Sequence, residues 1–368
     1  MPLVAHNELP TFAKLKEEGL RVLNPELAGR QDIRELHIGL LNMMPDAALE
    51  ATERQFLRLI GESNPIAQFY VHPFTLDALP REQKAREHID RYYESFDEIK
   101  NQGLDALIIT GANVIGADLS EEVFWQPLIE VADWAHSKVT STLCSCLTTH
   151  AVLDFRYGQK REKQRSKKWG VFRHQVIDES HPLVADINSE FDVPHSRWNS
   201  VYPEQFAAAG LRVLVTGDDG CVHLATSPDG FRTIFFQGHP EYDTVSLLKE
   251  YKRDVNLYIN REIDVYSPMP ENYFAEFNAA VMREYQGRVD RSLEQQADIP
   301  PFPEHLVLPG LKNTWQDTAS AVIGNWVGLI YQLTSIDRHQ PFMEGVDADN
   351  PLGLEMPSSQ AAVSGAVA

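Results

Sequence analysis

Two short segments of this chain carry residue types that together could perform nucleophilic catalysis. The first, residues 140–150, reads TSTLCSCLTTH and predicts a strand that ends near Cys146, with a helix leaving directly after it. The second, residues 237–242, reads QGHPEY and puts His239 at the end of another strand, with Glu241 two residues later. A thiol nucleophile, a base and a group that orients the base are the minimum set for acyl transfer through a thioester.

Cys146 is the best candidate for the nucleophile. A cysteine at the start of a helix lies close to unpaired backbone N–H groups and to the positive end of the helix dipole, which favour the thiolate. The following amides, beginning with Leu147, could donate hydrogen bonds to an oxyanion. A cysteine at a strand end is more often a small core residue, and Cys144 fits that interpretation.

His239 and Glu241 are the candidate base and its partner. On an extended segment, residues two apart face the same way, so Glu241 could hold the imidazole tautomer and stabilise its cation. Pro240 restricts the backbone between them. A His-Pro-Glu tripeptide alone is typical of a surface turn, but an upstream cysteine at a strand end favours the catalytic interpretation.

A zinc site is the competing interpretation of the same residues. Its ligands would be Cys144, Cys146, His150 and His239. Structural zinc sites favour two ligand pairs, each on a short turn, and this chain has no second cysteine pair. We therefore predict no metal.

Short apolar runs alternate with helical patterns along most of the chain, and these elements must position the two segments. The strand patterns are at 36–41, 67–71, 104–109, 139–143, 170–176, 212–215, 222–225 and 233–237. The helical patterns are at 47–60, 81–99, 121–136, 147–155, 246–259 and 318–333. This alternation predicts an α/β fold with a mainly parallel sheet flanked by helices. Functional groups gather beyond the carboxyl ends of such strands, where both segments lie.

Composition limits the cellular compartment in which we expect the protein and the classes of partner that it could bind. The net charge of -20 argues against nucleic-acid binding, and no apolar run approaches the roughly 18 residues of a membrane span. Three cysteines do not make a disulfide framework, which favours a reducing compartment. The N-terminus lacks the apolar run of a signal peptide. We expect a cytoplasmic protein that binds neither nucleic acid nor membrane.

A basic segment follows the candidate nucleophile. Residues 156–168 hold seven Lys or Arg side chains and one acid. Most charge runs are solvated faces, but in so acidic a chain this one could bind phosphate or carboxylate groups. Arg197 and Arg253 are further candidates to hold a substrate carboxylate.

The sequence resembles the homoserine O-acyltransferase family of methionine biosynthesis, of the homoserine O-succinyltransferase type. The resemblance extends over residues 1–340, and its ordered combination of segments is specific. The matching segments are LNMMP at 41–45, QFLRL at 55–59, ITGA at 109–112, TSTL at 140–143, PHSR at 194–197, GHPEY at 238–242, GNW at 324–326 and YQ at 331–332.

The resemblance implies a fold like that of class I glutamine amidotransferases and a ping-pong succinyl transfer from succinyl-CoA to L-homoserine. Cys146 would be the acylated nucleophile, His239 the proton acceptor and Glu241 its partner. The implied substrate-binding residues are Lys167, Ser196 and Arg253, and Ile115 falls where the family selects its acyl donor. The acyl-CoA is a substrate, so no cofactor is implied, and the family suggests a homodimer.

Alternatives remain at this stage. Ile115 matches neither the glycine associated with succinyl donors nor the glutamate associated with acetyl donors, so acetyl-CoA is an alternative donor. L-Serine is an alternative acceptor, because one methylene is worth only about 1–3 kcal/mol in selectivity. A glutamine amidotransferase or hydrolase is disfavoured because Ser145 and Leu147 stand where glycines usually flank the cysteine. A catalytically silent binding protein would not need the complete Cys, His and Glu set.

The patterns also suggest a division of the chain. We expect an N-terminal extension at 1–35, an amidotransferase-like acyltransferase domain at 36–297 and a C-terminal helical extension packing on it at 298–345. The boundary near 298 follows the proline-rich sequence DIPPFP. Residues 346–368 are small and polar, which predicts a disordered tail.

Overall fold

The computed structural model describes residues 3–64, 66–112, 114, 116 and 118–355. The strands are β1 (Leu3–Val4), β2 (Val22–Leu23), β3 (Glu35–Leu41), β4 (Gln68–Phe74), β5 (Ala106–Ile109), β6 (Ser141–Ser145), β7 (Glu162–Val176), β8 (Glu190–Ser200), β9 (Arg212–Gly217), β10 (Val222–Thr226) and β11 (Thr233–Phe236). The helices are α1 (Pro10–Glu17), α2 (Pro25–Ala28), α3 (Asp46–Ser63), α4 (Gln83–Tyr92), α5 (Phe96–Gln102), α6 (Trp125–Lys138), α7 (Leu147–Tyr157), α8 (Pro203–Ala208), α9 (Ser246–Ile259), α10 (Glu276–Gln295), α11 (Glu304–Val307) and α12 (Gln316–Leu333).

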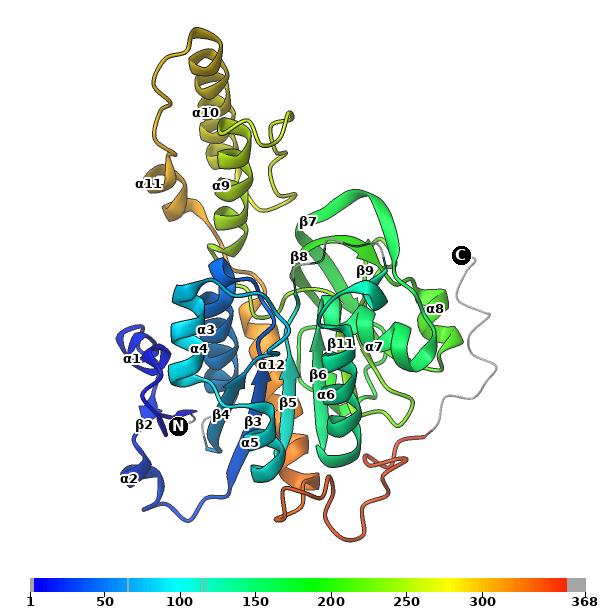
Figure 1. The fold of residues 1–368 in the computed structure, drawn as a ribbon. Helices are drawn as coiled ribbons and strands as arrows, with labels where there is room; N and C mark the ends of the chain where they lie inside the picture. The colour runs from blue at the N-terminus through cyan, green and yellow to red at the C-terminus, as the bar shows by residue number, and fades with distance from the viewer. Residues whose placement is uncertain (1–2, 65, 113, 115, 117, 356–368) are drawn as a thin grey trace.

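The strands form one eleven-stranded sheet in the order β2-β1-β4-β3-β5-β6-β11-β10-β9-β7-β8 (Figure 1). Every pairing from β2 across to β11 is parallel, whereas β10, β9, β7 and β8 are joined by antiparallel pairings. The parallel half needs helical crossovers between its strands, which the chain supplies. The predicted α/β fold with a mainly parallel sheet and flanking helices is confirmed.

Helices cover both faces of the parallel half. On one face α3 and α12 pack on the sheet, with Phe56 and Trp326 in a core that also holds Ile108 of β5. On the other face α5, α6 and α7 bury a second core, in which Leu128 of α6 lies with Leu107 of β5. Burial on both sides explains why the central strands read as continuous apolar runs.

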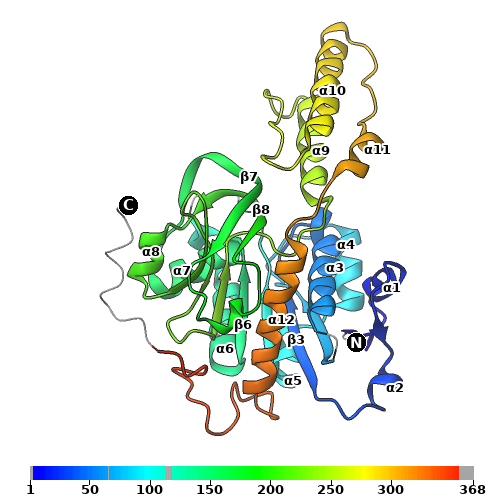
Figure 2. The ribbon, with the colours of Figure 1, turned by 180° about the vertical axis from the view of Figure 1, so that it is seen from behind.

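The helices α9, α10 and α11 project beyond the body of the sheet (Figures 1 and 2), and we call residues 246–311 the helical arm. The arm has its own apolar cluster, which includes Tyr251, Met282 and Val307. Trp169 and Val171 of β7 belong to the same cluster and join the arm to the antiparallel half of the sheet.

The structure differs from the sequence patterns in several elements. The helical pattern at 81–99 is two helices, since Ser95 begins α5 with a capping box in which Ser95 and Glu98 exchange hydrogen bonds. The strand expected at 170–176 begins at Glu162, because β7 pairs along most of its length with β8. The strand before the candidate nucleophile is β6 rather than 139–143. The strand β8 and the helix α10 were not expected.

The first and last segments that the structure describes contact the same core, through Leu3 and Leu352. The strands β1 and β2 extend the sheet at the edge beside β4. Leu352 packs on the main core, and the rest of the expected tail, residues 356–368, lies outside the described residues. The division into four segments stays a prediction. Within the part of the chain that the structure describes, no helix combines the length and apolar character needed to cross a membrane.

We predict that Trp326→Ala lowers the free energy of unfolding by about 3–5 kcal/mol, measured by urea denaturation. Trp326 is 1% exposed in the core between α12 and the sheet, and its Nε1 donates to Ser141 Oγ at 2.9 Å. Tyr331→Ala, on an exposed part of the same helix, is the control and should cost much less. Equal losses in the two variants would show that α12 is not held through this face.

Candidate active site

Cys146 lies at a sharp turn between β6 and α7. Its φ of 52° is in the left-handed region, which costs a non-glycine residue of the order of 1–3 kcal/mol. The Cys146 N–H donates to the carbonyl of Phe236 at 2.8 Å. Thr149 Oγ1 lies 2.8 Å from the same carbonyl and 2.9 Å from that of Cys144. These bonds between β6, β11 and α7 hold the turn and place the thiol at the helix N-terminus.

His239 reaches the nucleophile from the end of β11. Its backbone N–H donates to Pro194 O at 2.9 Å, and its imidazole lies within interaction range of the Cys146 thiol group. On the other side of the ring, Nδ1 lies 2.9 Å from Glu241 Oε1, and both side chains are buried. The backbone here is a turn, closed by a Tyr242 N–H bond to His239 O at 3.3 Å, and not the extended segment expected from sequence. The predicted contact forms across that turn.

The charges around His239 favour the imidazolium. Burial lowers the pKa of the imidazole, but the negative charges of Cys146 and Glu241 and the hydrogen bonds to both more than offset it, so the pKa is raised well above 6.5. Glu241 Oε2 is buried without a hydrogen-bond partner among the described residues, so the carboxylate acts through its other oxygen. The arrangement is a cysteine beside an imidazolium that a carboxylate orients.

An oxyanion could be held next to Cys146. The N–H of Leu147 is in the first turn of α7 and has no partner within the helix. Gly111, after β5, lies against this point: a Cβ built on it would be 3.9 Å from Leu147 N and 3.9 Å from Cys146 Cβ. The missing side chain leaves room at the thiol for a carbonyl oxygen.

The basic segment at 156–168 does not act as one patch. Arg156 pairs with Asp133 at 2.8 Å, near the end of α7. Arg161 lies within electrostatic range of Cys146 and donates to Gly116 O at 3.1 Å. Burial lowers the pKa of Arg161, with Glu122 and Cys146 acting in the opposite direction.

Lys167 and Ser196 meet at a partly buried acid, Glu250. Ser196 Oγ donates to Glu250 Oε2 at 2.6 Å, and Lys167 Nζ lies 3.3 Å from the same oxygen. Tyr242 OH donates to Glu250 Oε1 at 2.7 Å. Burial raises the pKa of Glu250, but Lys167 and the two hydroxyl donors lower it further, so it stays ionised.

The Glu250 cluster is connected to the base. The ring of Tyr242 stacks on the imidazole of His239, with centroids 4.2 Å apart and an interplanar angle of 18°. Sequence reasoning missed Glu250. The signal was its position in the helix pattern at 246–259, one turn before Arg253, where an acid and an arginine share a helix face.

The other predicted residues lie apart from this cluster. Arg253 is on the same helix as Glu250, but its side chain is 62% exposed and pairs with Asp254 at 2.7 Å. Lys168 pairs with a different acid, Asp219. Arg197 is buried, and its guanidinium is bonded to the carbonyl of Gln237 and to the thiol of Cys221. Ile115 lies outside the described residues.

The proposed zinc ligands do not gather on one point. His150 is buried in α7, and its Nε2 lies 2.9 Å from Gln237 Oε1. Gln237 Nε2 in turn donates to Val201 O and Val222 O. His150 therefore belongs to a network that supports the end of β11, below His239.

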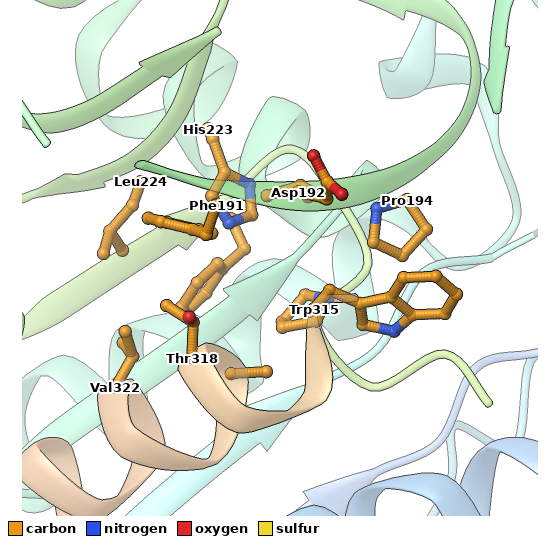
Figure 3. Close-up of a pocket in the computed structure, with 12 residues that line it drawn as sticks. Phe191, Asp192, Pro194, His223, Leu224, Trp315, Thr318 and Val322 are labelled. Carbon is orange, nitrogen blue, oxygen red and sulfur yellow. The ribbon is translucent and has the colours of Figure 1, made fainter. Parts of the chain in front are cut away.

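A small apolar pocket lies behind the catalytic turn (Figure 3). Trp315, Thr318 and Val322 line it from the α12 side, and Phe191, His223 and Leu224 from the sheet. Pro240 also lines it, and Trp315 Nε1 donates to Tyr242 O at 2.8 Å. The pocket has a volume of about 10 Å³, which is room for about one water molecule. It is therefore too small to hold a substrate.

Comparison with known proteins identifies the family. The family model for homoserine O-succinyltransferase matches residues 2–336. The chain belongs to the homoserine O-succinyltransferase family. It is 62% identical to a homoserine O-succinyltransferase of Allochromatium vinosum, over 96% of this chain and 99% of the relative. A homoserine O-succinyltransferase of Thiobacillus denitrificans is also 62% identical, over 96% of this chain and 100% of the relative.

Among solved structures, this family member is similar to a glutamine amidotransferase from Methylobacillus flagellatus. The TM-score is 0.44 at 12% identity, over 81% of this chain and 95% of that one. A likeness of this degree supports no inference about substrate or mechanism.

In this homoserine O-succinyltransferase family member, we predict that Cys146→Ala and Glu241→Gln each lower the pKa of His239, because each removes a negative charge that raises it. The imidazole should then lose its proton at lower pH, measured by NMR titration of the ring. Glu241→Gln should also reduce kcat roughly 10²–10⁴-fold.

Glu284→Gln, on an exposed face of α10, is the control and should leave the pKa of His239 unchanged. An unaltered His239 titration in both test variants would exclude the arrangement of a cysteine beside an imidazolium.

We predict that Lys167 and Glu250 are energetically coupled. Urea unfolding of Lys167→Met, Glu250→Gln and the double variant should give a coupling free energy of about 0.5–3 kcal/mol, because the two groups touch in a partly buried cluster. The matched control is the exposed Lys14–Glu50 pair, at 2.9 Å, for which the coupling should be about 0.2–1 kcal/mol. Additive effects at Lys167 and Glu250 would mean that the ion pair does not hold the site.

Proposed function

We propose that this protein transfers the succinyl group of succinyl-CoA to the hydroxyl of L-homoserine, giving O-succinyl-L-homoserine for methionine biosynthesis. The observation that carries the proposal is the arrangement of three side chains. Cys146 lies at a strained turn next to His239, and Glu241 orients the His239 ring. Membership of the homoserine O-succinyltransferase family supplies the donor and the acceptor. The enzyme works in the cytoplasm as a homodimer, and acyl-CoA is its substrate, with no further cofactor.

The first half-reaction forms an enzyme thioester. The Cys146 thiolate attacks the carbonyl carbon of succinyl-CoA, and the Leu147 N–H stabilises the oxyanion. The carbon–sulfur bond to coenzyme A breaks, and the leaving thiolate takes the proton from the His239 imidazolium. This is an exchange between two thiols, each with a pKa near 8.5 when unperturbed, so the step is close to balanced.

Acylation prepares the base for the second half-reaction. Once Cys146 is a thioester, it no longer carries the negative charge that raises the pKa of His239. The neutral imidazole can then accept the homoserine hydroxyl proton as the oxygen attacks the acyl carbon. Glu241 stabilises the imidazolium that forms. The proton on His239 then passes to the departing Cys146 sulfur. Conversion of a thioester into an oxygen ester is downhill and drives the cycle.

The charged residues beside the triad suit these substrates. We assign the amino acid carboxylate to Arg253 and the succinyl carboxylate to Lys167. Lys167 and Ser196 both contact the ionised acid Glu250. In this proposal, acetyl-CoA as donor and L-serine as acceptor remain the alternatives, because donor choice is assigned to Ile115.

Intact-mass measurement tests the acyl-enzyme directly. The protein mixed with succinyl-CoA should gain the mass of one succinyl group and release free coenzyme A, and L-homoserine should then restore the original mass. Cys146→Ser should accumulate no thioester. Cys144→Ser is the matched control and should still be acylated, because Cys144 is buried and burial raises the pKa of its thiol to about 12.

Three outcomes would contradict the proposal. A stable acetyl adduct from acetyl-CoA, with no succinyl adduct, would overturn the donor. Discharge by L-serine and not by L-homoserine would overturn the acceptor. Ammonia release from glutamine that depends on Cys146 would instead favour an amidotransferase on the same triad.

A further inference from the structure

A second group of chemically capable side chains lies away from the active site. His6, His72 and Glu94 each offer one ligand atom, and these atoms lie within 4.8 Å of one another. They come from three segments: the residues after β1, the strand β4 and the link between α4 and α5. In the sheet, β3 and β5 separate β4 from the nucleophile strand β6, so this group takes no part in the acyl transfer.

The hydrogen bonding of His6 leaves a nitrogen free for a ligand. Its Nδ1 lies 3.1 Å from Val4 O, and a carbonyl can only accept, so Nδ1 carries the proton. In the neutral ring, Nε2 then has the lone pair. Nε2 is buried and has no hydrogen-bond partner among the described residues. A ring that donates one N–H to a backbone carbonyl and leaves its other nitrogen bare is the arrangement of metal-binding histidines.

The other two side chains have supporting partners of the same kind. His72 Nδ1 lies 2.6 Å from Glu94 Oε1, and its Nε2 lies 2.9 Å from His37 Nδ1. Gln102 Nε2 donates to Glu94 Oε2 at 2.8 Å. Each candidate ligand therefore has a second contact that fixes its orientation, by way of Val4, His37 or Gln102.

We propose that His6 Nε2, His72 Nδ1 and Glu94 Oε1 bind a divalent transition-metal ion of the zinc type. Two imidazoles and a carboxylate are ligands that Zn²⁺ takes, and three protein ligands leave one position for water. The site revises the sequence-based expectation of no metal, which considered only the cysteine-containing segment. It does not depend on the proposed acyl transfer.

The proton balance of binding follows from the hydrogen-bond chain. Without the ion, His72 Nδ1–H donates to Glu94, and His37 Nδ1–H donates to His72 Nε2. With the ion in place of the first proton, His72 carries its proton on Nε2 and donates to His37 Nδ1. The proton displaced from His72 Nδ1 goes to solvent, and His72 Nε2 takes its new proton from His37 Nδ1. His37 Nε2, which lies 3.5 Å from Glu35 Oε2, takes up one proton from solvent and points it toward that carboxylate. The two rings keep the same number of protons.

The bound ion would fasten the N-terminal segment to the sheet. The strands β1 and β2 are only two residues long each, so few backbone hydrogen bonds hold that edge. A ligand that binds only the folded chain stabilises it, and here it would link residue 6 directly to β4.

Titration of the chelator-treated full chain with Zn²⁺ tests the proposal. The Cys146→Ala background should be used, so that the active-site thiol cannot bind the metal. We expect one Zn²⁺ per chain by calorimetry, and a rise in the melting temperature. His6→Ala should abolish both effects. Gln102→Ala, which removes only a supporting contact at an exposed side chain, should weaken binding roughly 10–100-fold.

His305→Ala, an exposed histidine on α11, is the matched control and should bind Zn²⁺ like the background protein. Co²⁺ in place of Zn²⁺ should give the visible absorption of a four-coordinate site, and His6→Ala should remove it. Absence of tight binding in the background protein, or equal binding by His6→Ala, would overturn the site. Acyl transfer in the unmodified chain should survive chelation, which separates this test from that of the proposed function.

Discussion

The active site depends on one backbone contact, the hydrogen bond from the Cys146 N–H to the carbonyl of Phe236. It joins the ends of β6 and β11, the two neighbouring parallel strands that carry the nucleophile and the base. Because Cys146 has a left-handed φ, the turn would relax without such bonds. The same carbonyl is approached by Thr149 Oγ1 from α7, so a single acceptor sets the strand, the helix and the thiol relative to one another.

Around this contact, the two halves of the sheet have different tasks. The parallel half is buried under helices on both faces and supplies the rigid strand ends. The antiparallel half brings in β8, whose Pro194 carbonyl accepts from the His239 N–H and whose Ser196 donates to Glu250. The backbone of His239 is therefore held in two ways. It follows Phe236 at the end of the parallel strand β11, and it donates a hydrogen bond to Pro194 of the antiparallel strand β8. Lys167 of β7 and Ser196 of β8 reach Glu250 from the antiparallel half, and Tyr242 connects Glu250 to His239.

The sequence predicted the central strands of the parallel half, and it singled out three residues that the structure brings together, because both have local signals. Continuous apolar runs followed by amphipathic patterns gave the strands and helices, and Cys146, His239 and Glu241 each stand at a strand end. Helix α9 was predicted with its observed bounds. The strand β8 was missed because its apolar and polar residues do not alternate cleanly, and a proline lies inside it.

Other features could not be predicted because they depend on packing between distant segments. Glu250 gains its importance only when Lys167, Ser196 and Tyr242 are brought to it from other elements. The grouping of His6 with His72 and Glu94 requires the register of β1 against β4, for which the described residues give one pair, Leu3 with Phe69. The basic segment was expected to act together, yet Lys167 and Lys168 of β7 pair with different acids, Glu250 and Asp219.

The helical arm is attached to the catalytic centre at both of its ends. It begins at α9, which carries Glu250 and so holds the hydroxyl of Tyr242. The chain returns from it at Trp315, whose indole N–H holds the carbonyl of the same Tyr242. Tyr242 stacks on His239, so the two ends of the arm hold the one ring that lies against the base. The arm and the base are therefore joined through a single aromatic side chain.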